Sequence, residues 1–287
     1  MKNIQLQQFL TLLTLLILGK QFAYIEVSYL DIFIMLLLAA IAEHTFIYLK
    51  NRSIDFFSFS ALSTALGLLL MMSAVSMWIY AVAIILALVQ KYLIKVANHH
   101  IFNPSNFALI LTMILFYDKA HITAGQLGDQ YWLSVVVLFL GGVVLYRANR
   151  LLISLLFVIF YLLFQNIFVV GHDPILLSED IFQRFYQVSY IVFILFMITD
   201  PRTTPSKLIY QLLFVVLITF IDAMLDRYFG YRVIHIFISL FVVSPVVPLV
   251  CYKPKKGDIY LLISIWLIVV SLSIYLENMP PYYFGVD

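Results

Sequence analysis

Long stretches without a charged residue constrain this chain more than any other feature. Between Asp55 and Lys91 there are 35 residues without Asp, Glu, Lys or Arg. Of the 287 residues, 64% are hydrophobic and only 11% are charged. A soluble domain of this length needs a far more charged surface, so the composition excludes an ordinary globular protein and predicts an all-α polytopic membrane protein.

The charge-poor windows predict about ten or eleven transmembrane helices. A helix needs about 20 apolar residues to cross a hydrocarbon core of about 30 Å, so no extramembrane catalytic domain fits. The windows at 56–72, 103–117 and 184–199 are short, and we interpret them as broken or re-entrant helices shielded by protein. The eleven windows cover residues 4–19, 28–48, 56–72, 75–95, 103–117, 130–146, 151–171, 184–199, 207–225, 232–252 and 259–276.

The distribution of Lys and Arg among the loops predicts the orientation. With the N-terminus inside and eleven crossings, twelve basic residues lie inside and five lie outside, as expected if positive charge gathers in the cytoplasm. The C-terminus is then outside. The five outer residues are Lys20, Lys119, Arg184, Arg227 and Arg232.

Composition also limits the partners and metal sites. The lipid bilayer is the predicted partner, and a net charge of +2 gives no reason to expect nucleic acid. The single Cys251 excludes a multi-cysteine metal or iron–sulfur centre built by this chain alone. We expect no metal site and assign no catalytic residue.

Two proline-interrupted polar motifs lie about a hundred residues apart, and each opens a helix on the inner side. The first is Asn103-Pro104-Ser105-Asn106, and the second runs from Thr199 to Ser206. Paired interrupted helices favour an internal repeat with a ligand site between its halves. We therefore expect one membrane domain over 1–287, with halves of about 1–130 and 131–287.

In the first motif, Asn103 followed by Pro104 is typical of a helix N-terminus, so capping alone would explain it. Asn106 lies one turn further into the membrane, where its amide needs a partner. It would hold a neighbouring helix or a polar ring.

In the second motif, an apolar helix ends at Pro201 and the next begins within a few residues, with Thr and Ser available as N-caps. Free backbone N–H groups beside Arg202 and Lys207 would suit an anionic group such as a phosphate. Alternatively, this is a capped cytoplasmic turn whose basic residues only set the topology.

Glu43 and Asp222 lie inside or at the edge of apolar windows. A carboxylate is costly there, so these two residues are candidates for an ion pathway. Alternatively, each reaches interfacial water near its own end of the membrane.

Four motifs, taken in order, resemble the RnfD/NqrB family, whose members are integral membrane subunits of the Rnf complex and of the sodium-pumping NADH:quinone reductase. The resemblance covers about residues 56–250. The motifs are Ser60–Leu66, Asn98–Phe107, Gly141-Gly142 with Tyr146-Arg147, and Phe196–Pro205.

The resemblance implies about ten helices in two inverted repeats with broken helices, a fold shared with urea-transporter-like channels. It also implies flavin-dependent electron transfer coupled to ion movement, oxidoreductase partner subunits and a bacterial cytoplasmic (inner) membrane. In the family, FMN is attached to Thr in a Ser-Gly-Ala-Thr sequence. Here the corresponding loop, 117–129, lacks that sequence and has Thr123 as its only threonine, so covalent FMN is not expected.

The function that we expect is therefore electron transfer with a non-covalent flavin, either FMN or riboflavin. The residues expected to hold it are Asn103, Pro104, Asn106, Thr199, Asp200, Arg202, Thr203 and Lys207. Fold does not determine function, so two alternatives stay open. One is a solute or ion transporter or channel on the same scaffold, and the other is a non-catalytic assembly subunit.

Overall fold

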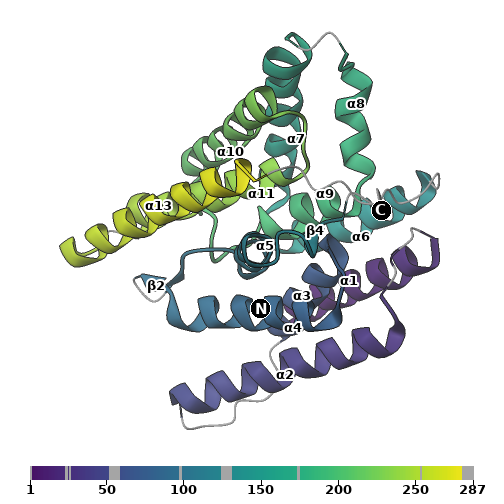
Figure 1. Ribbon diagram of the computed structural model, residues 1–287, viewed down its shortest axis with the longest axis vertical. Helices are drawn as coiled ribbons and strands as arrows, with labels where there is room; N and C mark the ends of the chain where they lie inside the picture. The colour runs from purple at the N-terminus through teal and green to yellow at the C-terminus, as the bar shows by residue number, and fades with distance from the viewer. Residues whose placement is uncertain are drawn as a thin grey trace.

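A computed structural model describes residues 2–22, 25, 27–51, 59–96, 99–123, 131–172, 175–252 and 254–279. The described chain is mostly helical, and each of the eleven predicted windows contains a helix (Figure 1). The first half contains α1 (Lys2–Phe22), α2 (Tyr29–Asn51), α3 (Phe59–Met71), α4 (Met77–Leu93) and α5 (Pro104–Leu115).

The second half is also helical but more often interrupted. It contains α6 (Tyr131–Arg147), α7 (Leu151–Gln165), η1 (Asn166–Val170), α8 (Ser178–Gln183), η2 (Arg184–Tyr186), α9 (Val188–Val192), η3 (Phe193–Met197), α10 (Leu208–Phe229), α11 (Ile234–Val243), α12 (Val246–Cys251) and α13 (Lys256–Glu277). The helix η1 continues α7 and η3 continues α9, in each case as one turn of π-helix.

Five helical segments are long and apolar enough to cross a membrane, which agrees with the prediction of an all-helical membrane protein. They are Tyr29–Leu49, Leu151–Val170, Leu208–Phe229, Ile234–Cys251 and Lys256–Glu277. Their outward faces carry many exposed large hydrophobic side chains, such as Phe33 on α2 and Ile159 on α7. So many exposed apolar side chains are unfavourable in water but favourable in contact with lipid.

Three of the predicted windows form helices that are too short to cross alone. Helix α5 has 12 residues and α3 has 13, so each is about 18 to 20 Å long at 1.5 Å per residue, against a hydrocarbon core of about 30 Å. The window at 184–199 is divided among η2, α9 and η3. The short lengths agree with the interpretation of these windows as broken helices.

Two small sheets, which the sequence did not predict, complete the ends of the broken helices. Strand β1 (Met72–Ala74) follows α3 and pairs antiparallel with β4 (Ala120–Ile122), which follows α5. The Thr123 N–H also donates to the Met71 carbonyl at 2.7 Å. Backbone groups at membrane depth need such partners, since lipid supplies none. The second sheet joins β2 (Lys95–Val96) to β3 (His99–His100), directly before α5.

The two halves pack against each other through their short helices. In Figure 1, α1 to α4 form the lower part and α7 and α10 the upper part, with α5, α9 and α11 between them. Helix α3 contacts α9, and α5 contacts α11. We call the end that carries Asn103 and Asp200 the inner end, following the predicted orientation, and the end that carries Glu277 the outer end.

Candidate functional site

The two proline motifs meet at a cavity of about 400 Å³ at the inner end. The cavity lies among the first turn of α5, the end of η3, one face of α3, and residues of α1 and α6. Of the eight residues predicted to hold a cofactor, five line it: Asn103, Pro104, Thr199, Asp200 and Arg202.

Asn103 caps α5 as the sequence predicted, and it also links the two motifs. Its side-chain oxygen accepts hydrogen bonds from the N–H groups of Ser105 at 3.1 Å and Asn106 at 3.2 Å, and Pro104 occupies the first turn. Its Nδ2 donates to Asp200 Oδ2 at 3.4 Å, across 97 residues of sequence. The amide thus uses its oxygen for the helix and its nitrogen for the neighbouring motif.

Asp200 is held in an ionised form by its neighbours. Burial alone would raise the pKa of this carboxyl, but His100 and the backbone N–H of Arg202 lower the pKa below its ordinary value. The Arg202 N–H donates to Oδ1 at 3.0 Å, and His100 Nε2 lies 3.9 Å from Oδ2. Asp200 therefore contributes a negatively charged side chain to the lining of the cavity at neutral pH.

The walls combine apolar side chains with a row of hydroxyls. Leu195 and Phe196 of the α9–η3 segment form part of the apolar surface, and Ser63 and Thr64 of α3 present polar groups. Helices α3 and α5 approach closely at Gly67, where a Cβ atom would lie 3.3 Å from Ser105 Oγ. A larger residue there would press on the first turn of α5 beside Asn103.

Lys91 and Glu43 form a buried ion pair at the edge of the cavity. Lys91 Nζ lies 2.5 Å from Glu43 Oε1 and donates to Ser60 Oγ at 3.0 Å. The Tyr92 hydroxyl donates to the same Glu43 oxygen at 3.1 Å. Glu43 therefore does not reach interfacial water as an isolated carboxylate, since its charge is matched by Lys91, and it is Lys91 that faces the cavity.

The remaining three predicted cofactor residues do not line the cavity. Asn106 is fully buried and donates to the Phe237 carbonyl of α11 at 3.1 Å, so it holds a neighbouring helix. Thr203 is buried in the turn after Asp200, and Lys207 is the exposed N-cap residue of α10.

The expectation that Thr or Ser caps α10 is wrong. No side chain caps this helix at Lys207, and the Thr204 hydroxyl instead donates back to the Asp200 carbonyl at 2.6 Å. The turn is completed by Gln211, whose Nε2 donates to the carbonyls of Pro205 and Ser206. These bonds satisfy carbonyl groups of the turn and leave the prediction of an anion site at the N–H groups around Lys207 untested.

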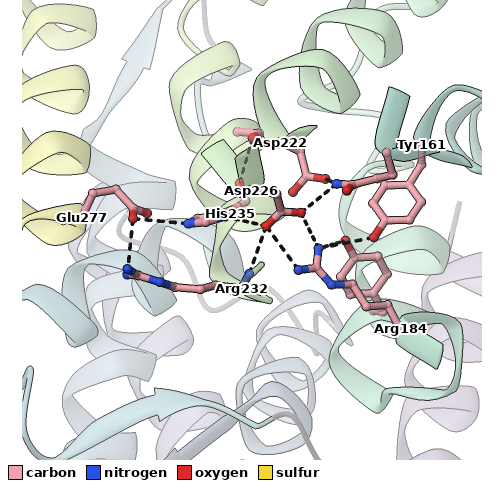
Figure 2. Close-up of polar contacts among 10 residues, drawn as sticks. Tyr161, Arg184, Asp222, Asp226, Arg232, His235 and Glu277 are labelled. Carbon is pink, nitrogen blue, oxygen red and sulfur yellow. Dashed lines mark hydrogen bonds and ion pairs between the residues drawn. The ribbon is translucent and has the colours of Figure 1, made fainter. Parts of the chain in front are cut away.

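A second polar cluster lies buried towards the outer end, around Asp222 (Figure 2). Asp222 is fully buried on α10, so it does not reach interfacial water. Gln165 of α7 donates through Nε2 to Asp222 Oδ2 at 2.8 Å and to Asp226 Oδ2 at 2.7 Å. The two carboxyls lie one helical turn apart and face the same side of α10.

Arg184 neutralises Asp226 from η2. Its two terminal nitrogens lie 2.8 Å and 3.2 Å from the two Asp226 oxygens, which is the bidentate geometry that fits guanidinium to carboxylate. The guanidinium also stacks on the Tyr231 ring at 3.3 Å and contacts the hydroxyls of Tyr161 and Tyr190. Charge counting treats Arg184 as a residue of an outer loop, and this is wrong, because Arg184 is buried as the partner of Asp226.

His235 connects this ion pair to the last helix. Its Nδ1 lies 2.6 Å from Asp226 Oδ1, and its Nε2 lies 3.2 Å from Glu277 Oε2 of α13. Arg232 Nη1 lies 3.5 Å from the same Glu277 oxygen. Figure 2 shows His235 between the two carboxylates.

Sequence reasoning identified Asp222 but missed the rest of this cluster. The available signal was the spacing of Asp222 and Asp226, since two acids one turn apart on an apolar helix require a cation from elsewhere in the fold. No sequence pattern names Arg184 as that cation.

Within the described residues, no group of three or more His, Cys, Asp or Glu side chains could hold a metal ion. Neither cluster therefore has the donor set of a metal centre. No protein-family model matches the chain, and a search of curated proteins finds no similar sequence.

Proposed function

We propose that the protein is a membrane electron-transfer protein that binds a flavin, without a covalent bond, in the inner cavity. The observation that carries the proposal is the convergence of Asn103 and Asp200 on one cavity, together with the likeness of both motifs to the RnfD/NqrB family. Electrons would pass to or from oxidoreductase partner subunits at the inner face of a bacterial cytoplasmic membrane.

The dimensions and chemistry of the cavity support a flavin ring. A volume of about 400 Å³ falls in the range of sites for small organic ligands, which is about 300 to 1,000 Å³. Asp200 and Asn103 offer an acceptor and an amide to the polar edge of the ring system. Arg202 also lines the cavity, and its positive charge would stabilise the anionic reduced form.

We also propose that the two halves are inverted repeats, with α1 to α5 equivalent to α6, α7, α9, α10 and α11. The packing supports this, because α2 contacts α4 as α7 contacts α10, and α4 contacts α5 as α10 contacts α11. Equivalent helices also meet across the halves, in the pairs α1 with α6, α3 with α9 and α5 with α11.

The register of the buried polar residues supports the same repeat. Glu43 and Lys91 are each the fifteenth residue of α2 and α4, and they pair at 2.5 Å. Gln165 and Asp222 are each the fifteenth residue of α7 and α10, and they pair at 2.8 Å. The same position joins the same two helices in each half.

The decisive experiment is the visible absorbance spectrum of the protein purified in mild detergent, before and after dithionite. We expect an oxidised flavin spectrum that bleaches on reduction, and flavin that acid or heat extracts without proteolysis. A colourless preparation that also fails to take up added riboflavin or FMN would rule the proposal out.

Paired variants locate the flavin. Asp200→Asn and Arg202→Gln should each lower flavin occupancy several-fold. Asp118→Asn and Arg227→Gln replace exposed residues outside the cavity and should leave occupancy unchanged. Equal loss in all four variants would place the flavin elsewhere.

The alternative function is transport of a small polar solute on the same scaffold. One observation favours it: Phe196 contributes the only phenyl, phenol or indole ring among the described residues that line the cavity, whereas flavin sites gain much from stacking on such rings. Uptake into proteoliposomes distinguishes the two functions. Flux of a solute, riboflavin included, that Asn103→Ala abolishes in a colourless protein would support transport.

A further inference from the structure

The outer cluster contains three carboxyls and three groups that can carry positive charge. The carboxyls are Asp222, Asp226 and Glu277, and each is at least nine-tenths buried. The positive groups are Arg184, Arg232 and His235. The two guanidiniums balance two carboxylates, so with all three carboxyls ionised the third is balanced only by a protonated His235.

With Asp226 and Glu277 both ionised, the geometry of His235 calls for two protons on its ring. Nδ1 lies 2.6 Å from one carboxylate oxygen and Nε2 lies 3.2 Å from another. Ionised carboxylates only accept hydrogen bonds, so each ring nitrogen needs a hydrogen to donate. A neutral imidazole would turn a lone pair towards Asp226 or Glu277 in a site that excludes water.

Asp222 is the carboxyl that depends on this proton. Within the described residues, its Oδ1 and the Oε1 of Gln165 have no hydrogen-bond partner. Asp226, in contrast, accepts from Arg184, Gln165 and the Arg232 N–H and is in contact with His235. An ionised Asp222 with one hydrogen bond is costly in so dry a site unless the cluster as a whole is neutral.

We infer that this cluster is a proton-binding site, in which His235 carries the bound proton between Asp226 and Glu277 and thereby balances Asp222. Glu277 contacts Arg232, whose side chain is 37% exposed, so these two residues connect the site to the surface. The site shares no residue with the inner cavity, so the inference goes beyond the flavin proposal and stands apart from it.

Binding of this proton has a structural consequence at the contact between α11 and α13. The ring of His235 joins these helices through Glu277. Loss of the proton leaves one net negative charge among buried groups and removes a donor from one of the two contacts. The deprotonated state should therefore loosen α13 from α11. The groups that face His235 and its partners are Tyr161, Gln165, Arg184, Tyr190, Tyr231 and Arg232.

The test is ¹⁵N NMR of histidine-labelled protein in lipid nanodiscs over a range of pH. The chain has six histidines, and the signal that disappears in His235→Asn belongs to His235. We expect both ring nitrogens of His235 to be protonated at neutral pH. A ring with one protonated and one bare nitrogen at neutral pH would overturn the inference, and this readout needs only the wild-type signal once it is assigned.

Charge-neutralising variants test the balance. Glu277→Gln keeps a side-chain oxygen that can accept from Nε2 but removes the charge, so the proton affinity of His235 should fall by about tenfold or more, which corresponds to about one pKa unit. Thr219→Val is the matched control, because Thr219 is buried on α10 and its hydroxyl donates to the carbonyls of Val215 and Val216 on its own helix. An unchanged affinity in Glu277→Gln would contradict the inference.

Discussion

The polar pairs at the two ends of the molecule occupy the same helical position but solve the problem of buried charge differently. At the inner end, Glu43 and Lys91 neutralise each other within one contact of 2.5 Å. At the outer end, Gln165 brings no charge to Asp222, and neutrality depends on Arg184, Arg232 and His235, which lie outside α7 and α10.

This difference has a consequence for each end of the protein. A self-neutral pair lets the inner end remain open beside a cavity, because Lys91 already has its counter-charge before any ligand binds. The outer cluster is neutral only while η2, α10, α11 and α13 are assembled around it. Neutralisation of the buried charges therefore depends on the packing of more elements at the outer end than at the inner end.

Of the variants that test this comparison, Arg184→Met should cause the largest loss of stability. The variant leaves Asp226 buried without its bidentate partner, and such a loss typically destabilises a protein by about 3 to 5 kcal/mol. Thermal unfolding in detergent, followed by intrinsic fluorescence, should show a large drop in Tm. The control Arg227→Met replaces an exposed residue near the end of α10, next to Asp226, and should unfold close to wild type. Equal behaviour of the two variants would mean that Arg184 does not carry the packing of the outer end.

The effects of substitutions at Glu43 and Lys91 on stability should depend on each other. Lys91→Met alone leaves the buried Glu43 uncompensated and should cost about 3 kcal/mol, at the lower end of the range for buried pairs because a cavity adjoins it. The double variant Glu43→Gln with Lys91→Met should recover most of that loss, as a double-mutant cycle of unfolding midpoints will show. If the stability loss of the double variant equals the sum of the losses of the two single variants, Glu43 and Lys91 do not neutralise each other.

The link between the halves should contribute less. Asn106→Leu removes the hydrogen bond to the Phe237 carbonyl of α11 and should cost about 1 kcal/mol. Thr112→Val is the control on the same helix, because the buried Thr112 hydroxyl has no hydrogen-bond partner within the described part of the chain. That variant should be neutral or slightly stabilising, and the same unfolding assay compares the two. A larger loss from Thr112→Val than from Asn106→Leu would contradict this reading of the contact.

The smallest expected effect is a pH dependence at Asp200. Its pKa is lowered in the folded protein from an ordinary value of 3.8, so its contribution to stability is fully present above that value and is lost as the pH falls through the lowered pKa. The difference in Tm between wild type and Asp200→Asn should be constant above about pH 5 and should shrink below about pH 4. A difference that changes between neutral pH and pH 5 would show that another group sets it.

Local rules predicted much of the fold and part of the inner site. Charge-free windows located the helices, and the Asn103-Pro104 pair predicted the cap of α5, because capping depends only on neighbouring residues. The contact between Asn103 and Asp200 joins residues 97 positions apart. The sequence alone does not show that two residues so far apart in the chain are in contact.

The outer cluster shows where charge counting fails. Arg184 is the first residue of the window at 184–199 and charge counting places it on the outer side, whereas the fold buries it against Asp226 and three tyrosines. Positive-inside counting assumes that each charge stays in water, and a cation recruited by a buried carboxylate violates that assumption. Asp222 was recognised because its own helix is apolar around it.

The β1–β4 pairing also bears on how this protein is made. Each of α3 and α5 is too short to remain in the bilayer as an independent span, and the strands that complete their ends lie 48 residues apart, with Met72 opposite Ile122 at one end and Ala74 opposite Ala120 at the other. During synthesis, β1 at the end of α3 can therefore pair with β4 only after α4 and α5 have been made and inserted. Biogenesis of the first half should then proceed as one delayed step, in which residues 59 to 123 leave the insertion machinery together rather than helix by helix.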